Sequence, residues 1–479
     1  MAKTPIFDVV VIGSGSAGFS AVEAAVGQGA RVCLVEKGKL GGECPNEACI
    51  PSKALLKAAS LYRALGTVRE FGMDASGRSF NWTSVQGYRE RVVARITGGA
   101  SGERYLQTLK RLKVTFKKGE AKFVDPSILD VGGERIAARA IVIATGTVDF
   151  IPPIDGLRDI RFWGWREALT TPRQPKSMAI IGGGPVACEI ATFYASFGTR
   201  VIILQSAPAV LHREDEEISH RAQEALEQLG IEVVVGAEVL SCVNGGMGAI
   251  GLTVRREKSG LKAGSGSAGK EEVFAVETVV VATGMRPNIG HLELGRAELA
   301  SDGELRTNQE QRTSRAHLFA AGDVDGGMMF THTAHHEGWV AGHNAARAAL
   351  KKKGGMLKTD ERVVPRVTFL DPEVASVGMT QAQAKEKYGD VLVGRYEIGS
   401  LGRAVTDHAA GGLVKLVAHP KTRKLLGAHL ICPHAGEMIH EAALAIELGS
   451  TIDKVAGMIH AFPTYAEGLK AAASLAKVE

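Results

Sequence analysis

Short apolar runs recur along the chain, and several are followed by a glycine-rich turn and then by a helical pattern. The first run is Asp8–Ile12, which is followed by GSGSAG, a helical stretch to about Gly27, and a second run at Arg31–Glu36. The same order of strand, turn, helix and strand recurs within Ser177–Gln205. Each pattern is typical of the β-turn-α-β unit that binds a dinucleotide. The chain therefore predicts an α/β fold with two Rossmann-like domains.

Two further apolar runs, Ala140–Gly146 and Val279–Gly284, both end in Thr-Gly. Each predicts a strand that closes a nucleotide-binding domain, which places domain boundaries near residues 150 and 284. The segment Lys258–Lys270 is rich in Gly and Ser, so we expect a mobile hairpin loop within the middle domain. The solvated segment Lys351–Gly355 is predicted to link this part of the chain to a further domain.

Strand and helix patterns alternate again after this linker, which predicts a C-terminal α+β domain. The expected strands are Val363–Phe369, Gly394–Ile398, Leu413–Ala418 and Lys424–Leu430, and the expected helices are Thr380–Tyr388, Gly436–Leu448 and a terminal one after Pro463. The predicted domains are 1–150 with its return segment 285–350, then 151–284, and finally 351–479.

The composition is typical of a soluble globular protein, because 45% of the residues are apolar and 23% are charged. A length of 479 residues fits about three domains. The formal charge of +5 is small for this length and does not indicate a nucleic-acid partner. Because no window approaches the ~20 apolar residues that span a bilayer, and the N-terminal run is too short for a signal peptide, we expect a cytoplasmic protein.

The first glycine-rich turn has the spacing of a dinucleotide fingerprint. Gly13, Gly15 and Gly18 follow a predicted strand and open a predicted helix. Glycines at these positions allow a tight turn and let a pyrophosphate approach the backbone N–H groups at the helix N-terminus. Glu36 ends the next strand, where a carboxylate accepts hydrogen bonds from ribose hydroxyls. Strand, turn, helix and acid together predict a dinucleotide site.

The second fingerprint consists of Gly182, Gly184 and Ala187. The residue that ends its second strand is Gln205, which can bond ribose hydroxyls but lacks the charge that repels a 2′-phosphate. No Arg follows directly, although His212 and Arg213 lie a few residues farther on. These contacts favour NAD over NADP. Two dinucleotide sites in one chain indicate one bound cofactor and one that exchanges.

Cys44 and Cys49 stand apart from the other four cysteines, which are scattered in apolar or mixed stretches and are expected to be buried and inert. The pair precedes a predicted helix at Ser52–Leu65, and a helix N-terminus stabilises a thiolate, as does the nearby Lys53. The alternative of a metal half-site is disfavoured because no further Cys or His flanks the pair. The pattern therefore predicts a redox-active pair, which a flavin would couple to a nicotinamide.

Over essentially its whole length the chain resembles the class I pyridine nucleotide-disulfide oxidoreductases, which include dihydrolipoamide dehydrogenase, glutathione reductase and mercuric reductase. The resemblance rests on GSGSAG with Glu36, GGECPNEACIPSK at 41–53, ATG at 144–146, GGGPVACE at 182–189, ATGMRPN at 282–288, AAGDV at 320–324 and HAFPTYAE at 460–467. It implies FAD on the first fingerprint, NAD(P)H on the second, and a homodimer built by the C-terminal domain.

The resemblance also implies roles for single residues. Cys49 would be the flavin-proximal thiolate and Cys44 the thiol that meets the substrate, and Lys53 would pair with Glu189 near the flavin. Asp323 would bind the flavin side of FAD. The implied FAD contacts are Gly13, Gly15, Gly18, Glu36, Lys53, Thr145, Gly146 and Asp323, and the implied NAD contacts are Gly182, Gly184, Ala187, Gln205 and Gly284.

A catalytic base is expected as well, because a dithiol attacks a disulfide as its thiolate. His460 matches the family base and Glu467 its orienting carboxylate, and the resemblance implies that both act in the active site of the second subunit. A carboxylate stabilises an imidazolium and fixes its tautomer, which makes the pair self-consistent. The two are seven positions apart, across Pro463, so a turn followed by a helix would bring them together.

Within the family, the leading interpretation is an NAD-linked dihydrolipoamide dehydrogenase, with a lipoyl domain or a small dithiol as its partner. The chain has no cysteine after Cys432, so mercury delivery by a C-terminal cysteine pair is unsupported. Pro45, Glu47, Ala48 and Phe462 depart from the usual lipoamide enzymes. These departures keep open a mercuric reductase-like or quinone-reducing NAD(P)H flavoenzyme, and a third alternative is a non-catalytic flavoprotein subunit.

Overall fold

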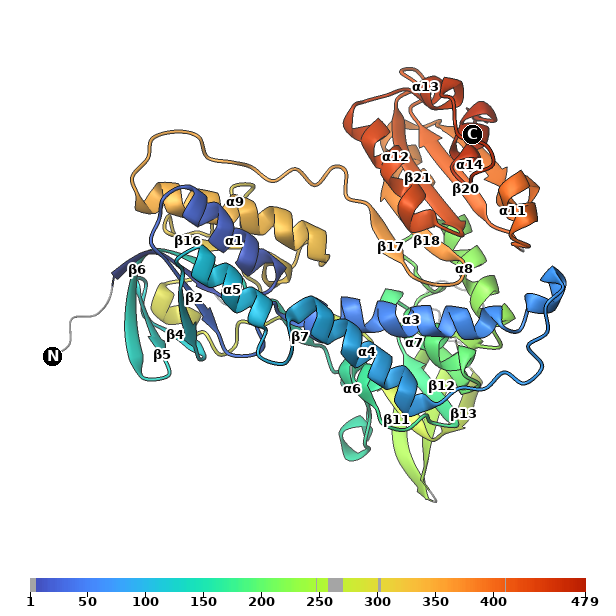
Figure 1. The fold of residues 1–479 in the computed structure, drawn as a ribbon, viewed down its shortest axis with the longest axis horizontal. Coiled ribbons are helices and arrows are strands. Elements are labelled where there is room, and N and C mark those ends of the chain that lie inside the picture. Colours follow the sequence, from blue (N-terminus) through green and yellow to red (C-terminus); the bar gives the residue numbers. More distant parts are fainter. Residues whose placement is uncertain (1–5, 247, 257–269, 300–302, 410) are drawn as a thin grey trace. The chain divides into compact units, whose positions relative to one another are not determined.

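The computed structural model describes residues 6–246, 248–256, 270–299, 303–409 and 411–479. The chain forms two compact units, and it enters each of them three times. Unit 1 comprises Met1–Ser52, Gly87–Phe150 and Met285–Glu361, and unit 2 comprises Lys53–Gln86, Ile151–Gly284 and Arg362–Glu479. Figure 1 shows the elements of both units in sequence colours. Assigning the units to FAD and NAD(P) binding remains a prediction.

The core of unit 1 is a seven-stranded sheet in the order β3-β2-β1-β6-β5-β4, with β16 also pairing with β6. Its strands β1, β2, β3, β6 and β16 pair in parallel, and their buried apolar runs suit a sheet that is covered on both faces. The strands of unit 1 are β1 Ile6–Ile12, β2 Val32–Glu36, β3 Thr115–Lys118, β4 Ala121–Asp125, β5 Ile128–Val131, β6 Glu134–Ile143 and β16 Leu318–Ala320, with the separate pair β7 Thr147–Asp149 and β15 Met285–Pro287.

Helices α1 (Ser16–Gly27) and α9 (Thr331–Ala349) lie side by side in unit 1 (Figure 1). Their backbones approach closely because α9 carries glycine at the contact. A Cβ atom at Gly338 would lie 2.1 Å from the carbonyl O of Ala17, and one at Gly342 would lie 2.1 Å from that of Ala21. The remaining helical segments here are α2 Glu43–Asn46, α5 Glu103–Arg111, η3 Leu294–Ala297 and η4 Asp323–Asp325, while α3 Cys49–Ala64 and α4 Trp82–Thr97 belong partly to each unit.

Unit 2 contains a second parallel sheet, in the order β10-β9-β8-β14, and an antiparallel sheet β11-β12-β13. The bounds are β8 Ser177–Ile181, β9 Arg200–Gln205, β10 Glu232–Val235, β11 Ala237–Gly246, β12 Ala249–Arg256, β13 Lys270–Val276 and β14 Thr278–Val281, with α6 Trp165–Thr170, α7 Pro185–Ser196, α8 Glu216–Gln228, η1 Val68–Phe71 and η2 Leu157–Asp159. The hairpin loop expected between β12 and β13 lies almost entirely outside the described residues.

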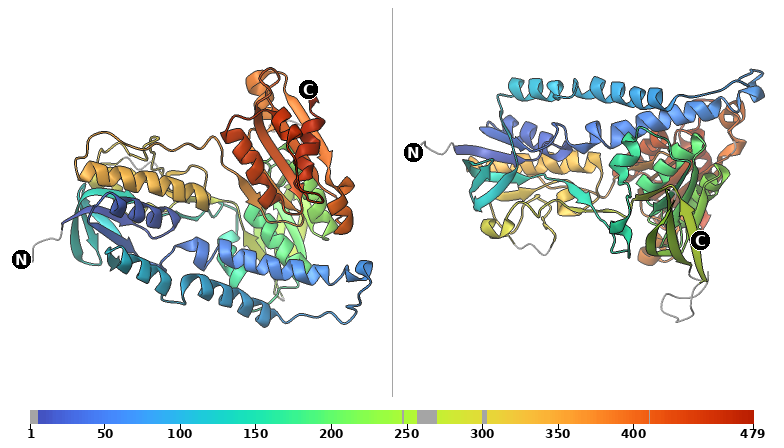
Figure 2. Two further views of the ribbon diagram at one scale, coloured as in Figure 1. Left: turned by 45° about the horizontal axis from the view of Figure 1, so that its top comes forward. Right: turned by 90° about the horizontal axis from the view of Figure 1, so that it is seen from below.

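The C-terminal part of unit 2 is a six-stranded sheet in the order β17-β18-β21-β20-β19-β22. Helix α12 lies along one face of this sheet, against β18 and β21 (Figure 2). The bounds are β17 Arg366–Thr368, β18 Glu373–Gly378, β19 Leu392–Glu397, β20 Leu413–Ala418, β21 Leu425–Cys432 and β22 Lys477–Val478, with α10 Gln381–Tyr388, α11 Gly402–Thr406, α12 Ala435–Glu447, α13 Ile452–Gly457, α14 Glu467–Ser474 and η5 Ile398–Ser400.

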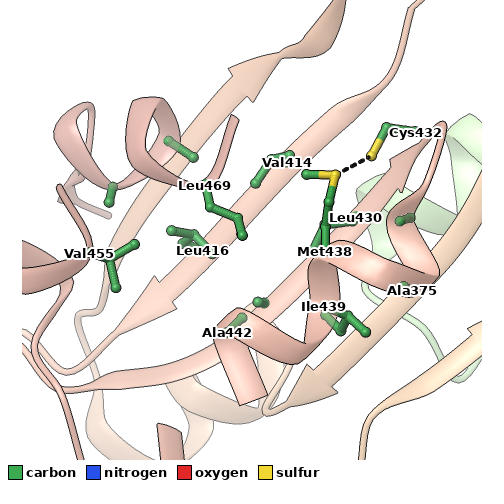
Figure 3. Packing of buried hydrophobic residues seen from close by; sticks show 14 of the residues in the cluster. Ala375, Val414, Leu416, Leu430, Cys432, Met438, Ile439, Ala442, Val455 and Leu469 are labelled. Atoms are coloured by element: carbon green, nitrogen blue, oxygen red, sulfur yellow. Dashed lines mark hydrogen bonds between the residues drawn. The ribbon is translucent and has the colours of Figure 1, made fainter. Parts of the chain in front are cut away.

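One apolar cluster holds this C-terminal sheet to its helices, as Figure 3 shows. Met438 of α12 and Leu469 of α14 meet Leu416 and Leu430 from the strands beneath them. The Cys432 thiol points to the Met438 sulfur 3.7 Å away, so this cysteine is a buried packing residue. Interdigitated side chains of this kind supply most of the free energy that stabilises such a layer.

Two of the differences from the sequence-based expectations concern the start of a helix and the segment expected as a linker. The helix expected to begin at Ser52 begins at Cys49, because proline is tolerated in the first turn, where its missing N–H would have no partner. The segment expected as a linker is bound to unit 1: Arg347 Nε donates to the carbonyl O of Gly354 at 2.8 Å, and Lys352 Nζ donates to that of Gln28 at 2.7 Å. The chain leaves unit 1 only after residue 361. Within the described ranges, no helix is long and apolar enough to cross a membrane.

Candidate active site

The first fingerprint forms a tight turn between β1 and α1. Gly13 has φ +101°, and a Cβ atom there would lie 2.2 Å from the carbonyl O of Ala144. At Gly18 a Cβ would lie 1.9 Å from the carbonyl O of Gly13. Nothing lies within 4 Å of the corresponding position at Gly15, the N-cap of α1. The turn is thus packed on the protein side and open at the helix N-terminus, where a pyrophosphate binds.

Glu36 is held at the end of β2 by the same turn. Its Oε2 accepts hydrogen bonds from the backbone N–H of Ser14 at 2.8 Å and from the Ser14 hydroxyl at 2.7 Å. Its Oε1 accepts from the N–H of Gly38 at 2.5 Å. A carboxylate offers about four acceptor positions, so Glu36 can still accept from ribose hydroxyls. These bonds orient the carboxylate next to the fingerprint.

Two further groups in unit 1 fit a bound dinucleotide. The Thr145 hydroxyl is buried and has no hydrogen-bond partner among the described residues. The next residue, Gly146, has φ +65°. Burial raises the pKa of the Asp323 carboxyl to about 6. A buried hydroxyl and a desolvated carboxyl are each stabilised when a ligand supplies hydrogen bonds. The residues present therefore fit the FAD that the resemblance implies.

The segment that carries the cysteines packs against the turn of the first fingerprint through a glycine. Gly42 has φ +68°, and a Cβ atom there would lie 2.6 Å from the Cα of Gly15. Only glycine allows the two backbones to come so close. Cys44 follows in α2 and Cys49 is the first residue of α3, and both are partly exposed. The structure therefore places the cysteine segment directly on the first fingerprint.

A residue that the sequence did not indicate contacts Cys49. Its Sγ lies 3.4 Å from Oγ1 of Thr331, the first residue of α9. The N-termini of α3 and α9 thus both lie at this sulfur, and the partial positive charge of a helix N-terminus stabilises a thiolate. The segment FTHTAHHEG, which follows AAGDV after a short turn, is the sequence signal from which Thr331 could have been recognised.

In unit 2, Lys53 and Glu189 form an ion pair. Lys53 Nζ lies 2.8 Å from Glu189 Oε2 and 3.0 Å from Oε1, and it also lies 4.7 Å from the centre of the Phe369 ring. The backbone N–H of Phe369 donates to Glu189 Oε1 at 3.1 Å. The Glu189 side chain is only 9% exposed, so its charge depends on these donors. The position of the pair beside a flavin stays a prediction.

The second fingerprint repeats the geometry of the first. A Cβ atom at Gly182, where φ is +112°, would lie 2.4 Å from the carbonyl O of Ala282, and the corresponding position at Gly184 is open. Ala187 is buried in the first turn of α7, and Gly284, which follows β14 after a short turn, has φ +120°. Gln205, at the end of β9, is 5% exposed. The turn is again open at the helix N-terminus.

His460 and Glu467 have other hydrogen-bond partners in the single subunit, and their pairing stays a prediction. His460 Nε2 lies 3.1 Å from Oε1 of Glu441 in α12, and Nδ1 lies 3.3 Å from the carbonyl O of Met458. Glu467 Oε2 instead accepts from the backbone N–H of Thr464 at 3.0 Å. The reason is that Glu467 begins α14, where a carboxylate satisfies an N–H group at the helix start.

Two family descriptions match the chain. Residues 7–338 match the pyridine nucleotide-disulphide oxidoreductases, and residues 364–473 match the dimerisation domain of that family. The chain belongs to the pyridine nucleotide-disulphide oxidoreductases. Membership confirms the expected enzyme class, the α/β fold with a C-terminal dimerisation domain, and a redox disulfide chemistry that uses FAD and a pyridine nucleotide.

Relatives of this disulphide oxidoreductase have different substrates. A mercuric reductase from Staphylococcus aureus is 33% identical over 470 residues, which cover 98% of this chain and 82% of the relative. A dihydrolipoyl dehydrogenase from Chlorobaculum parvum is 35% identical over 479 residues, covering 98% and 96%. The solved Cu(II) complex of the HOCl-induced flavoprotein disulfide reductase RclA from Escherichia coli has a TM-score of 0.83 at 26% identity, covering 98% of this chain and 100% of that one.

The dimerisation domain supports the expected homodimer. In the single subunit it exposes large apolar side chains, among them Leu444, Leu448, Ile459 and Phe462, which are 59%, 70%, 93% and 79% exposed. Apolar side chains that are exposed this far are typical of a surface that a partner covers.

Proposed function

We propose that this oxidoreductase uses NAD(P)H, FAD and the Cys44–Cys49 pair to reduce a soft metal ion, with Hg(II) as the reference substrate. The observation that carries the proposal is the position of His460, whose two ring nitrogens both face acceptor oxygens of its own subunit. The side chain is only 4% exposed. A metal ion bound by thiolates needs no base, whereas a dithiol substrate does.

The argument against a dithiol substrate is chemical. Dihydrolipoamide must lose a thiol proton before it attacks the disulfide, and this requires a base with an accessible nitrogen or oxygen. In the single subunit, Nε2 of His460 faces the acceptor Glu441 and Nδ1 faces the acceptor carbonyl of Met458, so neither nitrogen is directed at a substrate thiol in this arrangement. Phe462, an exposed side chain of the same segment at 79%, cannot accept a proton.

The residues assigned to the chemistry follow the expected order. Cys49 would be the flavin-proximal thiolate, beside Thr331 and two helix N-termini, and Cys44 the outer thiol. When bound, FAD supplies the two-electron transfer that links a nicotinamide to the cysteine pair or to a metal ion held by it. The proposed FAD contacts are Gly13, Gly15, Gly18, Glu36, Lys53, Thr145, Gly146 and Asp323, and the proposed pyridine nucleotide contacts are Gly182, Gly184, Ala187, Gln205 and Gly284.

The overall reaction is balanced without a further reactant. NAD(P)H gives up a hydride, its two electrons reduce Hg(II) to Hg(0), and one proton is released with NAD(P)⁺. Cys44 and Cys49 hold the ion as two thiolates, which are the ligands that soft metal ions prefer. The names of two relatives, a mercuric reductase and a reductase solved with Cu(II), accord with this class of substrate.

The segment just before Thr331 carries two soft thioether side chains. Met328 and Met329 are 41% and 38% exposed, and they stand just before Thr331, which contacts Cys49. Thioethers bind the same ions as thiolates, only more weakly. Replacing both methionines with leucine should raise KM for Hg(II) several-fold and leave the reduction of the flavin by NAD(P)H unchanged.

Dihydrolipoamide oxidation is the second candidate, and it includes a lipoyl domain as partner. It is favoured by the dihydrolipoyl dehydrogenase relatives, which match this chain over 96% or more of their own length. This reaction would need one of two things. Either a residue other than His460 acts as the base, or His460 gives up its contact with Glu441 when the dimer forms.

The deciding experiment compares acceptors with the FAD-loaded enzyme. NADH and NADPH oxidation is measured with Hg(II) in excess thiol, lipoamide, oxidised glutathione and a quinone, and NAD⁺ reduction is measured with dihydrolipoamide. We expect Hg(II)-dependent turnover that is lost in Cys44→Ser and Cys49→Ser and kept in Cys242→Ala, which alters a buried cysteine. Faster turnover with dihydrolipoamide than with Hg(II), abolished by His460→Ala, would overturn the proposal.

A further inference from the structure

Gln205 lies directly over the second fingerprint. It ends β9, and a Cβ atom at Gly183 would lie 2.9 Å from its Cγ and 3.0 Å from its Cδ. The residue at this position of a dinucleotide fold bonds the adenosine ribose and distinguishes NAD from NADP. A glutamine is ambiguous in this respect, because its amide can present either a donor or an acceptor.

The loop after Gln205 is folded back onto the same turn. The backbone N–H of Leu211 donates to the carbonyl O of Gly183 at 2.8 Å, and the Ser219 hydroxyl donates to the carbonyl O of Leu211 at 2.9 Å. Leu211 is 2% exposed and has φ +47°, a left-handed conformation that an ordinary residue adopts only when its surroundings impose it. The loop therefore has a defined position beside the Gln205 amide.

This loop determines which way the amide points. Gln205 Nε2 lies 3.3 Å from the carbonyl O of Ala209 and 3.4 Å from Nδ1 of His212. A carbonyl only accepts, so the group that faces Ala209 must be the NH₂. With His212 neutral and its proton on Nε2, Nδ1 accepts the second N–H. The two donors of the amide are then both used within the loop.

The remaining amide atom is an acceptor. Gln205 Oε1 receives no hydrogen bond from the residues that the structure describes. A ribose 2′-hydroxyl can donate to such an oxygen, as it donates to the carboxylate found in NAD-specific folds. A 2′-phosphate presents only acceptors and negative charge, so it would meet Oε1 unfavourably.

We propose that His212 and the Ala209 carbonyl orient the Gln205 amide as an obligate acceptor, which makes this uncharged residue select NADH over NADPH. The proposal rests on the assignment of the second fingerprint to the pyridine nucleotide. His212 acts through Gln205 and is a positioning residue. Arg213, which is exposed next to it, is the nearby cation that would favour the phosphate instead.

The test measures reduction of the enzyme-bound flavin by NADH and by NADPH, anaerobically and without any acceptor. This half-reaction is independent of the metal-reductase proposal, which can fail while the flavin is still reduced. The wild-type enzyme should prefer NADH by at least about tenfold in rate constant over dissociation constant, the ratio expected for one favourable hydrogen bond against one repulsive contact.

Three variants separate orientation from structure. His212→Ala frees the amide to turn its NH₂ outward, and it should lower the NADH preference about fivefold, mainly through tighter NADPH binding. Gln205→Glu supplies a fixed acceptor and should keep or raise the preference even when combined with His212→Ala. His220→Ala, at an exposed position of α8, is the matched control and should change nothing. Equal use of both nucleotides by the wild type, or an unchanged ratio in His212→Ala, overturns the proposal.

Discussion

His460 Nε2 lies 3.1 Å from Oε1 of Glu441, nineteen residues earlier in the chain. The contact joins the loop before α14 to the second turn of α12, and it buries the imidazole within its own subunit. In the single subunit these contacts are those of a packing residue, and the role of His460 as the general base expected of a dithiol oxidoreductase stays a prediction.

Replacing His460 tests this interpretation directly. His460→Ala should leave Hg(II)-dependent NAD(P)H oxidation within about twofold of wild type, because the side chain does not reach the substrate. Stability should fall by about 1–2 kcal/mol, since Glu441 loses its donor and a small cavity remains. Thermal unfolding and steady-state kinetics are measured together, with His440→Ala on the exposed face of α12 as control. Activity lost at unchanged stability would instead identify His460 as the base.

A second prediction concerns the ion pair of Lys53 with Glu189. Lys53→Met leaves a carboxylate that is 9% exposed with the Phe369 N–H as its donor, which should cost about 2–4 kcal/mol. Adding Glu189→Gln removes the unpaired charge, so the double variant should be more stable than Lys53→Met alone. Thermal unfolding of the wild type, Lys53→Met, Glu189→Gln and the double variant completes the double-mutant cycle. Additive losses in the double variant would show that the two side chains are not coupled.

Local patterns in the sequence predict the two β-turn-α-β units because they depend only on neighbouring residues. Gly13 and Gly182 are required by close contacts with the strand beside them, and their spacing to the next glycine is visible in the chain. The cysteine pair is predictable for the same reason, because Gly42 and Cys44 are neighbours in one short segment of the chain. Such features are predictable because the residues that define them are neighbours in the chain.

Contacts between distant segments are not predictable in this way. Thr331 reaches Cys49 across 282 positions, and the residues around Cys49 do not indicate this contact. Glu467 is the nearer carboxylate to His460 in the sequence motif, yet the start of α14 uses it for a backbone N–H. Only the packing of α12 against the loop brings Glu441 to the imidazole.

A third prediction concerns Lys415, which lies in β20 and is 2% exposed. Its Nζ lies 2.7 Å from Asp215 Oδ1 and 2.6 Å from Glu217 Oε1, at the N-terminus of α8. Lys415→Met leaves the buried Asp215 without its cation, so the protein should lose about 3–5 kcal/mol of stability. The exposed Lys421→Met is the control. Equal melting temperatures for the two variants would show that this ion pair contributes no stability.

Glu337 links stability to pH. It is 2% exposed and its Oε2 accepts from the backbone N–H of Gly322 at 2.5 Å. Burial, with the nearby charge of Asp325, raises the pKa of the Glu337 carboxyl from its ordinary 4.5 to about 9. The folded state therefore binds more protons than the unfolded chain between these values, so stability must fall as the pH rises through this range.

Glu337→Gln removes this titration while retaining a carbonyl oxygen for the Gly322 N–H. The wild type should lose on the order of 2–4 kcal/mol of stability between about pH 6 and pH 9 relative to the variant, whose stability should change much less. The interval starts at about 6 so that the raised pKa of Asp323 contributes little. Thermal unfolding of both FAD-loaded proteins across this interval measures the difference. Parallel curves would mean that Glu337 is already ionised at neutral pH, with its charge stabilised by a neighbouring donor.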